Sequence, residues 1–321
     1  MAHIDKDNVM TLLGEKILPG ESAEINFKTA KLYTTTSVKM PVFVERSKKK
    51  GAVILITAGI HGDEINGIEI VRQLISRGIN KPKKGTIICI PLLNVFGFLN
   101  MSRQFPGGRD LNRVFPGLPN GSLASRFAYQ FVNEILPVAD FCIDFHTGGA
   151  SRFNAPQVRV VKDDEKLLEY ARIFGAPFIV YSKNISKSYR HTCAILNKPI
   201  LLYEGGKSCE SNKEIAKMGL HGVIRILAHF GMLREKFKVP KPANSILIED
   251  TTWMRAKFSG LLHVNIPIGK FVEKGENIAL ITDPYGKFSH KVQAKQKGYI
   301  ININQSPIVY QGDAIFHLSK G

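Results

Sequence analysis

Four short segments of the chain each contain a residue type that a hydrolytic metal site uses. They are Gly-Ile-His-Gly-Asp-Glu at 59–64, Asp-Leu-Asn-Arg at 110–113, Asp-Phe-His at 144–146 and Tyr-Glu-Gly-Gly at 203–206. Zinc accepts a mixture of histidine nitrogens and carboxylate oxygens. Three such ligands, His61, Glu64 and His146, leave one tetrahedral position for water, which is typical of a catalytic zinc site. The sequence therefore predicts one zinc ion per chain.

The elements around these segments indicate how the ligands can meet. The apolar run 52–58 predicts a buried strand, and the helical spacing of apolar residues over 63–74 predicts a helix with Glu64 in its first turn. His146 follows another strand predicted over 141–145. A lone histidine is more often a core residue, so the prediction rests on the combination. Open α/β sheets place their sites at the carboxyl ends of strands, where all three ligands are expected.

Glu204 is the candidate general base. It follows the apolar residues 200–203 and precedes two glycines, so its carboxylate is expected to project from a strand end into open space. A base is needed because the water activated by zinc must lose a proton, which is then returned to the leaving group. Taken alone, Glu204 is equally well interpreted as a surface carboxylate at a turn.

The loop after Leu93 contains the candidate substrate ligands. Its prolines and glycines can hold a guanidinium rigidly. Arg113 with Asn112 is expected to bind a substrate carboxylate, because arginine binds carboxylates in two-pronged geometry. A second arginine could stabilise an oxyanion. Arg103 is the first candidate for that role and Arg109 the alternative.

Strands that alternate with helices over residues 1–240 predict an α/β catalytic domain with a mostly parallel mixed sheet flanked by helices. Further strands are expected over 23–33, 39–44, 86–93, 178–181 and 200–203, and further helices over 125–136, 166–174 and 214–230.

The composition changes after a linker at 239–244, which contains two prolines. Residues 245–321 consist of short extended runs that repeat, since 260–278 resembles 298–315. This repeat predicts a C-terminal all-β, barrel-sandwich-like domain with internal pseudo-symmetry. A biotinyl or lipoyl carrier would present a modified lysine between the halves, but residues 283–286 read Asp-Pro-Tyr-Gly. The domain is therefore interpreted as a structural or site-covering module.

The net charge of +17 over 321 residues raises the question of a nucleic-acid partner. The lysines are dispersed and no recognition motif accompanies them, so we predict no nucleic-acid binding and a field that attracts small anions. Four scattered cysteines, no secretory signal and no membrane-spanning apolar run predict a cytoplasmic protein without a membrane partner. The oligomeric state is left open, with a homo-oligomer among the alternatives.

Together the motifs resemble the succinylglutamate desuccinylase/aspartoacylase family, relatives of the zinc carboxypeptidases. The resemblance implies hydrolysis of the amide of a small anionic N-acyl amino acid by attack of zinc-bound water, with Glu204 as the base. It also favours Arg103 over Arg109, because the oxyanion arginine of the family precedes the segment that corresponds to 110–113.

One feature departs from the family pattern. Aspartoacylase-like members read a side-chain carboxylate with an arginine between the second histidine and the catalytic glutamate. Arg190 is the nearest candidate, but the number of residues between it and Glu204 does not match the family pattern well. Neither N-acetylaspartate nor succinylglutamate is therefore assumed as substrate. A metallocarboxypeptidase acting on the C-terminus of a short peptide is the alternative, because Asn112 and Arg113 could hold a terminal carboxylate. A non-enzymatic basic binding or carrier module is the third hypothesis, and the complete ligand set argues against it.

Overall fold

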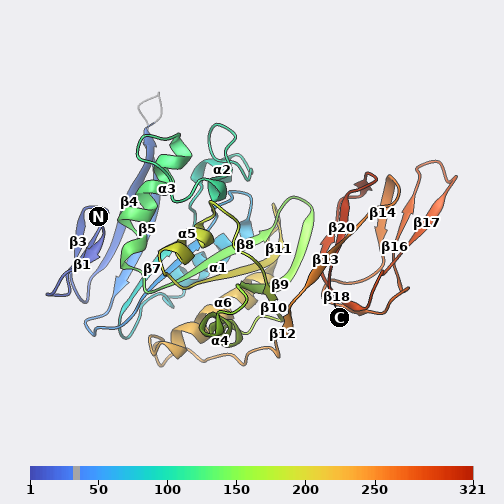
Figure 1. The fold of residues 1–321 in the computed structure, drawn as a ribbon. Coiled ribbons are helices and arrows are strands. Elements are labelled where there is room, and N and C mark those ends of the chain that lie inside the picture. Colours follow the sequence, from blue (N-terminus) through green and yellow to red (C-terminus); the bar gives the residue numbers. More distant parts are fainter. Residues whose placement is uncertain (32–36, 321) are drawn as a thin grey trace.

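A computed structural model describes residues 1–31 and 37–320, and Figure 1 shows their fold. The strands before residue 245 are β1 (His3–Ile4), β2 (Met10–Leu12), β3 (Glu15–Ile17), β4 (Ser22–Lys31), β5 (Ser37–Arg46), β6 (Val53–Ala58), β7 (Thr86–Ile90), β8 (Phe141–Gly148), β9 (Arg152–Val160), β10 (Phe178–Tyr181) and β11 (Ile200–Lys207). The strand expected over 23–33 is found as β4, and positions 32 and 33 lie outside the described residues.

The helices are α1 (Ile65–Ser76), α2 (Val95–Leu99), α3 (Leu123–Glu134), α4 (Glu165–Phe174), α5 (Tyr189–Ile195) and α6 (Lys213–His229), with two 3₁₀ turns, η1 (Leu111–Arg113) and η2 (Leu136–Val138). Among the described residues, none of these helices combines the length and the apolar character needed to cross a bilayer.

The centre of the molecule is a mixed sheet whose neighbouring strands β11, β8, β6 and β7 run parallel. Every residue of β6, β7 and β8 is buried, as expected for apolar strands that are covered on both faces. Helices α1, α4 and α6 cover one face, and α3 and α5 lie on the other (Figure 1). The predicted mostly parallel sheet flanked by helices is therefore confirmed.

Helix α1 begins two residues later than the sequence predicted. Glu64 is the residue before the helix, with φ −91° and ψ 74°, rather than part of the first turn. Its backbone is not helical because the chain is still turning out of β6, and its side chain makes no helix-capping hydrogen bond. The carboxylate is consequently free to turn toward the two histidines.

Strand β9 and helices α2 and α5 were not predicted. Pro156 lies inside β9, and a proline ordinarily argues against a strand with neighbours on both sides. The strand is nevertheless central, since it pairs with β10, β11 and β18 (Gly298–Asn304). This omission matters because β9 carries three side chains of the cavity wall, Arg152, Asn154 and Arg159.

The C-terminal region, defined as residues 245–320, is all-β, as expected. Its strands are β12 (Ile246–Ile248), β13 (Thr251–Arg255), β14 (Gly260–Val264), β15 (Phe271–Val272), β16 (Asn277–Thr282), β17 (Ser289–Gln293), β18, β19 (Ile308–Val309) and β20 (Ala314–Ser319). Strands β17, β16, β14 and β19 form a separate sheet, whereas β18, β20 and β13 extend the large sheet through β9. In Figure 1 this region lies at one end of the molecule, beyond β11 and β9.

The internal repeat is visible at two glycines. Gly260 begins β14 and Gly298 begins β18, and each lies against the last residue of the antiparallel partner strand. A Cβ on Gly260 would lie 2.4 Å from the carbonyl oxygen of Thr282, and one on Gly298 would lie 2.2 Å from that of Ser319. Both positions require glycine for the same reason, the close approach of a backbone.

Candidate functional site

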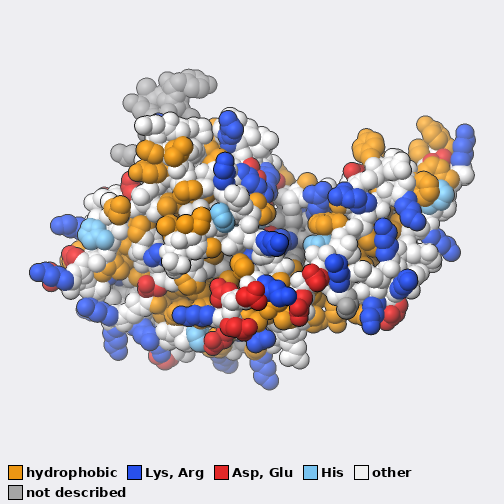
Figure 2. All heavy atoms as spheres, viewed as in Figure 1, with side chains coloured by type: hydrophobic (Ala, Val, Ile, Leu, Met, Phe, Trp, Pro, Cys, Tyr) orange, Lys and Arg blue, Asp and Glu red, His pale blue; other side chains and the backbone are white. Residues whose placement is uncertain are grey.

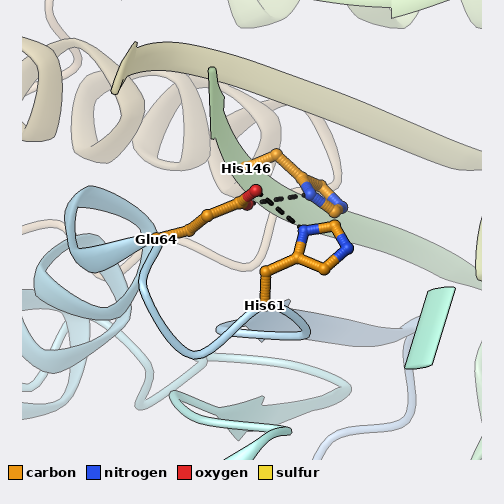
Figure 3. A group of neighbouring side chains, drawn as sticks. All are labelled: His61, Glu64 and His146. Carbon is orange, nitrogen blue, oxygen red and sulfur yellow. Dashed lines mark hydrogen bonds and ion pairs between the residues drawn. The ribbon is translucent and has the colours of Figure 1, made fainter. Parts of the chain in front are cut away.

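Three side chains meet at the carboxyl ends of β6 and β8 (Figure 3). His61 lies in the turn after β6, Glu64 precedes α1, and His146 lies in β8. Nδ1 of His61 is 2.7 Å from Oε1 of Glu64, and Nδ1 of His146 is 3.0 Å from Oε2. One ligand atom from each residue lies within 4.8 Å of the others, and all three residues are buried. The structure thus brings together the three predicted ligands.

The far nitrogen of each imidazole is held by an aspartate. Nε2 of His61 lies 3.2 Å from Oδ1 of Asp110, and Nε2 of His146 lies 2.8 Å from Oδ2 of Asp144. A carboxylate only accepts hydrogen bonds, so each Nε2 carries a hydrogen. In a neutral imidazole the lone pair is then on Nδ1, and both Nδ1 atoms face Glu64. Two lone pairs and a carboxylate directed at one point fit a divalent cation, and the aspartates are the outer partners such ligands use.

The charges of the histidines and of the carboxylates around them shift the pKa values of His61, Glu64 and His146. Burial lowers the pKa of His61, but the charge of Glu64 together with the hydrogen bonds to Asp110 and Glu64 outweighs burial, and the pKa is raised. Burial likewise opposes the charge of His146, yet Asp144 and Glu64 raise its pKa well above the ordinary value. Burial opposes the ionisation of Glu64, and the two histidines nevertheless lower its pKa. A cation at this position therefore competes with protons for the same ligands.

Glu204 lies beside the cluster because of strand register. It is the Cα partner of His146 across the parallel strands β11 and β8. Asn154 donates from Nδ2 to Oε2 of Glu204 at 2.6 Å, and Arg159 approaches the same oxygen at 2.9 Å. Both contacts fall on Oε2, so among the described residues Oε1 has no hydrogen-bond partner.

Arg103 lies next to the ligands, and Arg109 does not. Nε and Nη2 of Arg103 donate to Oδ2 of Asp110, at 3.1 and 2.8 Å. Its Nη1 is 3.6 Å from Oε1 of Glu64. Asp110 therefore contacts both His61 and the guanidinium of Arg103. Arg109 is exposed, makes a backbone bridge with Phe105 and is not part of the cavity wall.

The other predicted substrate residues line the same cavity, but in different ways. Oδ1 of Asn112 accepts from the backbone N–H of Tyr189 at 2.8 Å, which joins η1 to α5. Arg113 is exposed and lines the cavity. Arg190 is buried and donates to Oγ and the carbonyl oxygen of Ser182, at 2.9 and 2.6 Å. Burial, together with the charge of Arg159, lowers the pKa of Arg190 to about 10, so it stays cationic at neutral pH.

The cavity in front of the ligands has a volume of about 500 Å³. Its wall includes several residues that the sequence analysis did not select: Arg152, Asn154, Arg159, Lys183, Trp253 and Asn302. Asp144 stands two residues before His146, which was an available signal for its role, whereas Asp110 lies within the motif at 110–113 but 49 positions from His61. Trp253 and Asn302 come from the C-terminal region, and the sequence offered no signal that these residues reach the site.

The site combines two histidines and a glutamate with a second glutamate nearby. It lies at the carboxyl ends of central parallel strands of a mixed sheet, and such an arrangement is typical of a hydrolase. The model of the succinylglutamate desuccinylase/aspartoacylase catalytic domain matches residues 50–230. The chain belongs to this family, which confirms the resemblance inferred from the motifs.

Relatives and solved structures agree with this assignment. The chain is 29% identical over 257 residues to N-alpha-acetyl-L-2,4-diaminobutyric acid deacetylase of Halomonas elongata, covering 77% of this chain and 75% of the relative. The product-bound ectoine utilization protein EutE (DoeB) of Ruegeria pomeroyi has a TM-score of 0.80 at 22% identity, covering 94% of this chain and 95% of that one. A succinylglutamate desuccinylase/aspartoacylase of Rhodobacter sphaeroides has a TM-score of 0.80 at 23% identity, with coverage of 93% and 95%. These two structures share the fold.

Proposed function

We propose that the protein is a zinc-dependent amidohydrolase that removes the acyl group from a small N-acyl amino acid. The observation that carries this proposal is the convergence of His61, Glu64 and His146 on one point, with Glu204 aligned beside His146. The family and the deacetylase relative from Halomonas elongata support the reaction class. The nitrogen and oxygen ligands support zinc as the ion.

Each side chain has a role that follows from its contacts. Zinc at this site supplies Lewis acidity and makes water a nucleophile at neutral pH. Oε1 of Glu204 takes the proton of the attacking water and returns it to the leaving amine, because its other oxygen is already engaged. Arg103, fixed by Asp110, stabilises the negative charge that develops on the acyl oxygen.

The charge of the cavity supports an anionic substrate. Lysine and arginine in its wall are Arg103, Arg113, Arg152, Arg159, Lys183 and Arg190. Its carboxylates already have partners, since Glu64 and Asp144 contact the histidines and Glu204 contacts Arg159. A substrate with a second carboxylate therefore fits this wall better than one whose side chain ends in an ammonium group.

A panel of substrates tests the proposal. Zinc-loaded and chelator-stripped protein is incubated with N-acetyl-L-aspartate, N-succinyl-L-glutamate, N-acetyl-L-2,4-diaminobutyrate and dipeptides with a free carboxyl terminus. We expect zinc-dependent release of the acyl group, fastest for the compounds with two or more carboxylates. Cleavage of the dipeptides alone would establish the carboxypeptidase alternative. Fully zinc-loaded protein that cleaves none of these compounds would overturn the proposal.

A further inference from the structure

A chain of hydrogen bonds joins the C-terminal region to Glu204. Nδ2 of Asn302, in β18, lies 2.6 Å from Oδ1 of Asn154, in β9. Nδ2 of Asn154 in turn donates to Oε2 of Glu204 at 2.6 Å. The two asparagines are buried and are direct Cα partners across the antiparallel strands. The pairing of strands β9 and β18 therefore fixes the relative positions of the two asparagines.

The acceptor at one end fixes the direction of every bond in this chain. The Glu204 carboxylate can only accept, so Asn154 must turn its NH₂ group toward it. The carbonyl oxygen of Asn154 then faces β18 and needs a donor, which only the NH₂ group of Asn302 supplies among the described residues. The amide of Asn302 therefore has one orientation, and its Oδ1 is left without a partner within the described chain.

We infer that Asn302 is a positioning residue for the general base, acting through Asn154. This inference rests on the proposed role of Glu204. Asn154 and Arg159 together hold Oε2, which keeps Oε1 as the oxygen available for proton transfer. Without Asn302, Oδ1 of Asn154 loses its donor, and the amide that restrains the carboxylate is held only at its Glu204 end. The C-terminal region thus contributes to catalysis and does more than cover the cavity.

The neighbouring Asn304 provides a matched control. It lies two residues further along β18, is also buried, and donates from Nδ2 to the carbonyl oxygen of Ala314 rather than to β9. Asn302→Leu and Asn304→Leu remove the same chemical group from the same strand. We expect similar losses of thermal stability from both variants, so a difference in turnover would not come from stability. Because Asn302 also lines the cavity, KM is measured beside kcat to separate an effect on Glu204 from a lost substrate contact.

The test measures kcat, KM and zinc content with the fastest substrate of the panel. Asn154→Leu removes a hydrogen bond to a charged group, and we expect kcat to fall about 10- to 100-fold. Asn302→Leu acts one bond further away, and we expect a fall of about 3- to 10-fold with KM and zinc unchanged. Asn304→Leu should retain the wild-type kcat.

Several outcomes would overturn the inference. If Asn302→Leu matches Asn304→Leu in kcat while Glu204→Gln is inactive, Asn302 does not position the base. A rise in KM with kcat unchanged would make Asn302 a substrate contact. If Glu204→Gln keeps full turnover, the proposed function fails instead. Crystal structures of both leucine variants test the inference without turnover: the Glu204 carboxylate should change orientation in Asn302→Leu only, and an unchanged carboxylate there would contradict it.

Discussion

Glu204 and His146 are direct neighbours across strands β11 and β8, whose parallel pairing aligns their Cα atoms. Partners in adjacent strands are about 4.8 Å apart and point to the same face of the sheet. The sheet itself therefore places the proposed base next to a proposed metal ligand, and no flexible loop is involved. All neighbouring residues of β8 are buried, so this spacing is fixed by core packing.

The first prediction concerns Glu204. Glu204→Gln keeps the shape of the side chain and the contact from Asn154 but removes the basic oxygen. We expect kcat to fall about 10²- to 10⁴-fold with one zinc retained per chain. Glu210→Gln is the control, because Glu210 pairs with Lys207 outside the cavity wall. Steady-state kinetics and metal analysis check the prediction, and normal turnover of Glu204→Gln would show that another group is the base.

The meeting of His61, Glu64 and His146 was predictable from the sequence, whereas the restraints on Glu204 were not. His61 and His146 each follow an apolar run, and parallel strands bring their carboxyl ends to one edge whatever the register. The contacts of Arg159 and Asn302 depend instead on which strands β9 pairs with and in what register. Antiparallel pairing between β9 and β18 joins residues about 150 positions apart in the chain, and no local spacing encodes it.

The second prediction concerns the aspartate behind His146. Asp144→Asn weakens the contact that fixes the imidazole, and we expect the Kd for zinc to rise about 10- to 100-fold. Asp140→Asn is the matched control, because Asp140 accepts a hydrogen bond from the backbone of Val53 and touches no ligand. Competition with a chelator of known affinity measures both. Equal zinc affinities of the two variants would contradict a role for Asp144 in orienting His146.

The third prediction separates Arg103 from Arg109. Arg103→Lys removes the two-pronged contact with Asp110 and the guanidinium beside Glu64. We expect kcat to fall about 10²- to 10³-fold, the usual effect of losing an oxyanion donor. Arg109→Lys changes an exposed side chain outside the cavity and should behave as the wild type. The reverse order of kcat values would assign the oxyanion role to Arg109.

The fourth prediction concerns substrate charge. Arg190 is buried in the cavity wall and stays cationic at neutral pH, since its pKa is lowered only to about 10 by burial and by the charge of Arg159. Arg190→Met should raise KM for a substrate with two carboxylates about 10- to 100-fold with little change in kcat. Lys183→Met is the control, because Lys183 is an exposed cation of the same wall. If both variants change KM equally, the substrate is attracted by the total positive charge of the cavity wall and not by a specific contact with Arg190.

The last prediction concerns the dependence of stability on pH. The imidazole of His317 stacks on Trp253 at 4.2 Å, with an interplanar angle of 3°. Burial, and secondarily the charge of Arg159, lowers its pKa to about 4. Because the folded pKa lies below the unfolded value, the protonated form favours unfolding. The contribution of His317 to stability is therefore present above about pH 6.5 and is lost as the pH falls toward 4.

Between pH 7 and 4.5 we expect the free energy of unfolding to fall about 2 kcal/mol further in the wild type than in His317→Gln. His263→Gln removes an exposed histidine of the same region and should follow the wild type. Urea titrations of the three proteins at both pH values measure the differences. A parallel fall in the wild type and His317→Gln would show that His317 does not titrate on unfolding in this range. Other titrating groups would then account for the fall in the free energy of unfolding at acid pH.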